Sequence, residues 1–258
     1  MPLRPVRPAA PEVTGWPHRS VANADAGIGR VAESFHWVKA LLDTAKATGD
    51  PDLLIAGHAT ASAYYFWIGR PKECVERGDQ VLALYDGQKH RDLVHQLNQD
   101  PKTRVGCYSS VCTWMLGYPD RAVRLVDETD SHARRRAHPF DLGFALLIGA
   151  WLFDFHCEPK KMRKRADECG QLGRDNSLPL LWSMFAPQAC GVALIREGKA
   201  AEGISSIKAG LKVWDTSGGG VRTPYLQAVL AEGMARLGDL DGALELVDKA
   251  IAQIERPG

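Results

Sequence analysis

Aromatic side chains recur at matching places along the chain and are the residues best suited to bind another molecule. They fall on the first helix of successive predicted helix pairs, at slots that face inward when the pairs stack. Aromatic anchors supply most of the binding energy at such surfaces, and a groove lined by them suits an extended peptide or an amphipathic helix. Counted back from the predicted turns, the inward slots hold Phe66, Trp67, Trp114, Trp151, Phe155, Phe185, Gln188, Tyr225 and Glu232.

The competing interpretation is that these aromatics fill space between long repeats and meet no ligand. Phe144 and Trp151 fit it best, because both lie in Leu142–Phe153, the longest apolar run of the chain. That run is too short to cross a bilayer, which needs about 20 residues. We therefore expect a buried core helix here and no membrane partner, and both interpretations of the aromatics stay open.

The segment between His90 and Asp100 contains three potential metal ligands, His90, His95 and Asp100. Their spacing matches no known ligand pattern, and no cysteine lies close to them in sequence. Asp100 directly precedes Pro101, which is typical of an N-cap residue followed by the first residue of a helix. We therefore predict no metal site, and leave open a role for this loop at the edge of the groove.

The residue pattern does not indicate catalysis. A nucleophile needs a base within reach, yet Cys107 and Cys112 have no histidine three or four positions away on their predicted helix. The sequence contains no GxSxG motif and no GxxxxGK[ST] motif. The glycine-rich stretch 217–220 follows no predicted strand and is interpreted as a link between repeats. We therefore predict that the protein is not an enzyme and uses no cofactor.

Two basic runs could contact phosphates. One is Arg134–Arg136, and the other is a cluster of lysines and arginines from Lys160 to Arg165. Such runs are usually solvated helix faces, and the chain as a whole is almost neutral, with 32 basic and 31 acidic side chains among 258 residues. Near-neutral charge gives no general reason to expect a nucleic-acid partner. Nucleic-acid binding through the second run is kept as an alternative.

The elements that would position these residues are repeated helical hairpins. From Val31 onward the apolar spacing is helical, and strand signals are nearly absent. Four segments end a helix at a glycine and place a small residue five positions later, where a second helix can cross the first closely. A fifth segment fits if Cys157 stands in the glycine slot. The predicted turns are Gly69, Gly117, Cys157, Gly198 and Gly238.

This arrangement predicts an all-α, right-handed superhelical solenoid of tetratricopeptide-like hairpins. The last hairpin, LAEGMARLGDLDGALELVDKAI, carries the pattern most clearly. The standard tetratricopeptide repeat has about 34 residues and HEAT-like pairs about 40. Most steps here are near the longer value. The spacing is therefore specific for helical hairpins and less specific for the tetratricopeptide class.

We expect two regions along the chain. Residues 1–30 are rich in proline and are predicted to form a flexible arm. Residues 31–258 are predicted to form the solenoid, with about five helix pairs and a leading helix at 31–47. The apolar side of that helix is expected to lack a partner unless the N-terminal arm or another chain covers it, which would permit a homodimer through this end or indicate a piece of a larger protein.

The cysteines and the N-terminus bear on the cellular compartment. The six cysteines form no CxxC pair, and the first residues contain no apolar signal region. Scattered cysteines in a long chain of this kind are more often buried thiols than disulfides. We therefore expect a cytoplasmic protein with reduced cysteines.

Several motifs in succession resemble a known family. The stretches LALYDGQKHRDLVHQLNQDP, WMLGYPDRAVR and AHPFDLGFAL are similar to the C-terminal tetratricopeptide region of bacterial signalling proteins that carry a class III adenylate/guanylate cyclase domain and a P-loop ATPase module. The similarity covers roughly residues 35–255. The chain departs from the family at Leu97-Asn98, where an aromatic residue and a glycine are usual. The cyclase and ATPase modules have no counterpart here, so no catalytic residue is carried over.

The resemblance implies a regulatory solenoid and not an active cyclase. We expect a non-catalytic scaffold that binds a protein segment, a peptide or a small effector in its concave groove. Two alternatives remain: a helical-repeat protein that binds nucleic acid through its basic helix, and a remnant of a cyclase–ATPase protein with no role of its own.

Overall fold

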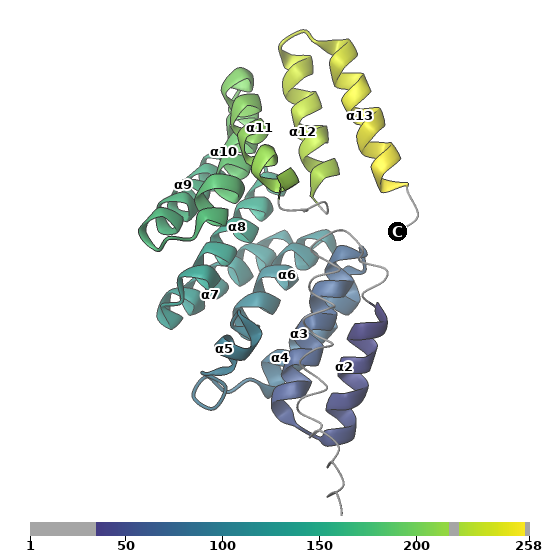
Figure 1. Cartoon of the computed structure of the whole chain (residues 1–258), viewed down its shortest axis with the longest axis vertical. Coiled ribbons are helices and arrows are strands. Elements are labelled where there is room, and N and C mark those ends of the chain that lie inside the picture. The colour runs from purple at the N-terminus through teal and green to yellow at the C-terminus, as the bar shows by residue number, and fades with distance from the viewer. Residues whose placement is uncertain (1–34, 217–221, 256–258) are drawn as a thin grey trace, which may run out of the picture.

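The computed structural model describes residues 35–216 and 222–255, which fold as stacked antiparallel helices without a strand (Figure 1). The predicted arm at residues 1–30 lies outside the described part. The main helices are α2 (Phe35–Thr48), α3 (Pro51–Trp67), α4 (Pro71–Leu84), α6 (Pro101–Met115), α7 (Pro119–Arg136), α8 (Pro139–Phe155), α9 (Pro159–Asp175), α10 (Ala186–Arg196), α11 (Ala200–Thr216), α12 (Thr223–Arg236) and α13 (Leu240–Ile254).

The helices α3 to α13 pair as hairpins whose turns lie where the sequence predicts them. The turn glycines 69, 117, 198 and 238 have φ values of 71°, 89°, 86° and 89°. This left-handed conformation ends the first helix of each pair and is easy for glycine, which has no Cβ. Cys157 occupies the equivalent place between α8 and α9 with a φ of 56°, so a residue with a Cβ is held in the glycine conformation.

That conformation makes Cys157 a site for stabilisation. The left-handed region costs a residue with a side chain about 1 kcal/mol or more, and Cys157 is exposed, so its thiol has no packing to lose. We expect Cys157→Gly to raise the free energy of unfolding by about 1 kcal/mol. Urea titration followed by circular dichroism measures the change. Cys157→Ala keeps the Cβ and should change stability by less than about 0.5 kcal/mol; an equal gain in both variants would assign the effect to the thiol instead.

Small residues bring the two helices of a pair close together, as expected. A Cβ on Gly203 would lie 2.6 Å from the carbonyl oxygen of Gly191, so α10 and α11 touch through their backbones. The equivalent positions Cys74, Ala122 and Ala243 are buried in the other pairs. In the third pair this slot holds the larger Met162, which is also buried.

Two irregular segments interrupt the repeat. The first turn-to-turn step is longer than the others because the stretch between α4 and α6 contains the extra short helix α5 (Leu93–Leu97). The fourth pair opens with a π-helical segment, η1 (Leu180–Phe185), which runs directly into α10. Neither segment was expected from the hydrophobic spacing.

The leading helix α2 packs on the solenoid through its apolar side. Val38, Leu41 and Ala45 are buried, and α2 contacts α3. The expectation that this side lacks a partner is therefore wrong, because α3 covers it. Among the described helices, none is long and apolar enough to cross a membrane.

Candidate functional site

A cavity of about 150 Å³ opens where the first helices of four pairs, α3, α6, α8 and α12, come together. Five of the nine residues that the sequence assigns to the groove line it, three residues were not anticipated, and aromatic side chains dominate. The lining residues are Phe66, Trp67, Val111, Met115, Trp151, Phe155, Arg222 and Tyr225.

The aromatic rings around the cavity support one another. Trp67 meets Trp151 edge-on with ring centroids 6.3 Å apart, and Phe155 meets Tyr225 edge-on at 6.5 Å. Edge-on pairs at such distances are favourable beyond the area they bury. The contacts join α3 to α8 and α8 to α12, so residues far apart in sequence form one wall. This wall stabilises the stack and at the same time leaves apolar surface at the cavity.

The other predicted groove residues lie beside the cavity or inside the core. Trp114 stacks on Phe155 with centroids 5.3 Å apart, and Phe185 is half-buried behind Arg222, 6.0 Å from its guanidinium carbon. Gln188 has no exposed surface, and a Cβ on Gly210 of α11 would lie 2.7 Å from its side chain. Gln188 therefore belongs to the contact between α10 and α11 and cannot face a ligand in the groove.

A chain of polar contacts borders the cavity. The Tyr225 hydroxyl donates a hydrogen bond to Asp154 at 2.7 Å, and Arg196 pairs with the same carboxylate at 2.9 Å. Glu232 joins the chain by ion pairs with Arg196 and Arg236. Glu232 is thus an ion-pair partner of two arginines, not an isolated charge at the groove surface. Burial and the neighbouring Asp154 raise the pKa of Tyr225, so its hydroxyl stays a donor.

Arg222 is the least expected residue of the cavity wall. It is the N-cap of α12 and is only 5% exposed, with its guanidinium carbon 3.7 Å from the ring centre of Trp151. Its three guanidinium nitrogens are buried and have no hydrogen-bond partner among the residues that the structure describes. Burial lowers the pKa of Arg222 to about 9. The planar guanidinium group, stacked on Trp151 and shielded from water, therefore forms one side of the cavity wall.

The sequence carries one signal for Arg222. A helix N-terminus is the positive end of the helix dipole, so a cation there is unfavourable. The caps of α3 and α6 are Asp50 and Asp100, as this rule favours. Arg222, followed by Thr223 and Pro224, breaks this rule, but so does the exposed Arg70 at the start of α4, so the signal does not single out Arg222 by itself.

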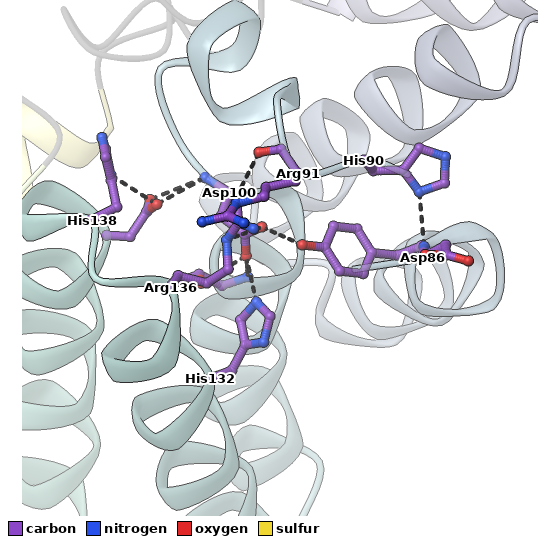
Figure 2. Close-up of polar contacts among 10 residues, drawn as sticks. Asp86, His90, Arg91, Asp100, His132, Arg136 and His138 are labelled. Atoms are coloured by element: carbon purple, nitrogen blue, oxygen red, sulfur yellow. Dashed lines mark hydrogen bonds and ion pairs between the residues drawn. The ribbon is translucent and has the colours of Figure 1, made fainter. Parts of the chain in front are cut away.

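The second polar centre is built around Asp100, at the opposite end of α6 from the cavity residue Met115 (Figure 2). Asp100 caps α6 as predicted, accepting a hydrogen bond from the Thr103 backbone N–H at 2.8 Å. Its carboxylate also accepts from the Tyr85 hydroxyl at 2.7 Å and lies 2.8 Å from His132 Nε2. Arg136 is 3.7 Å away. One fully buried carboxylate thereby links α4, α6 and α7.

The contacts of Asp100 and His90 bear on whether this segment could bind a metal ion. The carboxylate of Asp100 already has partners for both oxygens. His90 Nδ1 accepts the backbone N–H of Asp86 at 2.8 Å, so this nitrogen has no free lone pair. Within residues 35–216 and 222–255, no group of three histidine, cysteine or acidic side chains is arranged to hold a metal ion. The cluster fits a structural joint between repeats.

The cluster's electrostatics follow from burial and hydrogen bonding. Burial alone would raise the pKa of Asp100, but hydrogen bonds from His132, Tyr85 and Thr103 outweigh it and hold the pKa at about 2. The backbone N–H of Asp100 in turn donates to Asp141 at 3.0 Å. Burial raises the pKa of Asp141, against the opposing attraction of His138. Asp100 is therefore ionised in the folded protein, whereas ionisation of Asp141 is opposed by its burial.

The basic run on α9 does not form one exposed face. Arg165 is buried in large part, with a side chain 12% exposed, and pairs with Asp130 of α7 at 2.6 Å. Arg163 pairs with Glu197 at 2.8 Å, and Lys161 with Glu158 at 2.5 Å. In the other run, Arg134 pairs with Glu168 at 2.6 Å. Most of these cations already have acidic partners within the solenoid.

The repeated hairpins define an all-α, right-handed superhelical solenoid of the tetratricopeptide-like class. A Rap protein complexed with competence and sporulation factor has a TM-score of 0.68 at 10% identity, over 93% of this chain and 74% of that one. The apo form of RapI gives 0.63 at 8% identity, over 95% and 100%. Tetratricopeptide-like repeats of a putative kinesin light chain from Podosopora anserina give 0.50 at 14% identity, over 81% and 99%. At these identities the likeness establishes the fold.

Comparisons by sequence identify no relative of this chain. No protein-family model matches the chain, and no curated protein sequence matches it.

Proposed function

We propose that this protein is a non-catalytic regulatory scaffold that binds an extended segment of a partner protein in its concave groove. The observation that carries the proposal is the aromatic cavity between α3, α6, α8 and α12. Its volume of about 150 Å³ is below the roughly 300–1,000 Å³ of pockets for drug-sized ligands. A cavity of this size suits one large apolar side chain of a peptide that continues along the groove.

The fold supports this proposal. The chain is similar in structure to a Rap protein complexed with competence and sporulation factor, so one protein with this arrangement of helices has been seen with another factor bound. We extend that mode of action to this chain, and propose residues 31–258 as the binding solenoid, in the cytoplasm. As the resemblance to cyclase–ATPase signalling proteins implies, its partner would be a signalling module.

Nucleic-acid binding is the weaker candidate. Its basis is the row of cations on α9, but Arg163 and Arg165 already form ion pairs with acidic residues from elsewhere in the solenoid.

Selection from a library of displayed peptides tests the groove. Met115 lines the cavity and is 51% exposed, so a larger side chain can cover the opening without disturbing the core. We expect peptides selected on the wild-type protein to contain a large apolar residue, and to bind Met115→Trp at least tenfold more weakly. Fluorescence anisotropy with labelled peptides measures the dissociation constants.

The neighbouring Leu116 supplies the matched control. It is 40% exposed, ends the same helix and lies outside the cavity lining. Leu116→Trp should bind the selected peptides as the wild type does. Equal binding to all three proteins would place the peptide elsewhere and remove the groove as the binding site.

A further inference from the structure

The last described helix, α13, turns most of its large apolar residues away from the protein, although Leu246 packs against the core. Leu240, Leu244, Ile251 and Ile254 are 62%, 64%, 47% and 69% exposed, while the small Ala243 and Ala250 are buried. With the half-buried Val247, the apolar row runs 240, 244, 247, 251 and 254. Alternating steps of four and three are the seam of a coiled coil, in which a second helix covers the row. We call these five residues the α13 stripe.

The preceding repeat shows what normally covers this face. Counted from the turn glycines, Leu244 and Ile251 of α13 correspond to Ile204 and Leu211 of α11. Both α11 residues are partly buried. They pack against a hydrophobic core cluster to which α12 contributes Leu226, Val229 and Leu230. A Cβ on Gly233 of α12 would lie 3.0 Å from Ile204. The α13 stripe is therefore a stacking face of the same kind as the one that α12 covers on α11.

The charges beside the stripe select the occupant. Asp241, Asp248 and Glu255 follow one another at seven-residue steps along one flank, and all three are exposed. In a coiled coil, residues in such flanking rows pair with charges on the partner helix and set its identity. The opposite flank holds the buried Ala243 and Ala250, so the acidic row is the side that meets the partner's charges.

We propose that the α13 stripe binds an amphipathic helix of a partner protein, with leucine or isoleucine along its seam and lysine or arginine facing Asp241, Asp248 and Glu255. A second copy of α13 is a poor occupant, because an antiparallel pair would bring two acidic rows together. The surface lies at the C-terminal end of the solenoid (Figure 1) and shares no residue with the aromatic cavity. It is thus a second interaction surface, independent of the groove.

Two designed helical peptides test the charge requirement. Both carry a leucine seam in heptads; one has lysine and the other glutamate at the positions that face the acidic row. We expect the full-length protein to bind the lysine peptide at least tenfold more tightly than the glutamate peptide, measured by fluorescence anisotropy at low salt. The variant Asp241→Lys/Asp248→Lys should reverse this order, because it replaces two of the three flanking acids by cations at exposed positions.

A third variant tests the stripe itself. Leu244→Asp/Ile251→Asp places charges on two exposed seam positions and should abolish binding of both peptides, while Leu116→Asp, at an exposed leucine elsewhere, should not. Circular dichroism checks that each variant is folded. Equal affinity for the two peptides, or no binding to the wild type, overturns the proposal. So does a wild-type dimer in sedimentation velocity that Leu244→Asp/Ile251→Asp converts to monomer, since the stripe would then be covered by a second copy.

Discussion

Replacing Asp100 with alanine should cost the protein about 3–5 kcal/mol of unfolding free energy, the largest loss that we expect from any single polar side chain. The carboxylate is 0% exposed and has partners on three helices. Its removal leaves the Tyr85 hydroxyl, the Thr103 N–H and the His132 ring without an acceptor, and leaves Arg136 without its anion. Urea titration followed by circular dichroism measures the loss.

Asp239 is the matched control. It caps α13 through the Gly242 N–H, as Asp100 caps α6, but it is exposed and joins no network of side chains within the described part of the chain. Asp239→Ala should therefore cost only the usual price of an N-cap, about 1 kcal/mol. If both variants lost the same amount, Asp100 would be a cap only, and the contacts in Figure 2 would add nothing to stability.

The effect of Asp100 has a defined pH dependence. Its pKa is held at about 2 in the folded protein, below its ordinary value of 3.8. For a carboxylate with a lowered folded pKa, the stabilisation is complete above the unfolded pKa and is lost as the pH falls through the folded one. The difference between wild type and Asp100→Ala should therefore shrink as the pH falls from about 4 toward about 2.

The hairpins could be predicted because their determinants are local. A turn glycine, a small residue five positions later and a helical apolar row all lie within one repeat, and Gly69, Gly117, Gly198 and Gly238 take the expected conformation. Even Cys157 was placed correctly, because the spacing of the repeat required a turn there. Asp100 was identified as a cap from its neighbour Pro101 alone.

The site could be predicted only in part, because it depends on contacts between repeats. Counting slots from the turns gathered five of the cavity residues. The same counting placed Gln188 in the groove, although its slot turns toward α11, where Gly210 leaves room for it. The run of cations on α9 suggested one basic face, but Arg165 reaches inward to Asp130, a residue 35 positions earlier. A single sequence does not show such long-range partners.

Arg222→Met is expected to stabilise the protein, by about 2 kcal/mol at pH 7. Burial lowers the pKa of Arg222 from 12.5 to about 9, which means that the folded protein holds this charge at a cost. The cation–π contact with Trp151 offsets about 2 kcal/mol of the free energy that burying the charge costs. Methionine keeps an apolar stem against the ring, needs no hydrogen-bond partner and removes a cation from the positive end of α12. Thermal and urea unfolding measure the gain.

The pH profile separates this explanation from simple repacking. A base whose folded pKa is lowered leaves the unfolded state with more bound protons between the two pKa values, so wild-type stability rises there with pH. The advantage of Arg222→Met should therefore be constant below about pH 8 and shrink above about pH 9. Arg121→Met, at an exposed arginine, should change stability by less than about 0.5 kcal/mol at any of these pH values. A loss of stability in Arg222→Met would instead show that the guanidinium is a structural support for Trp151, and that the cavity depends on its charge.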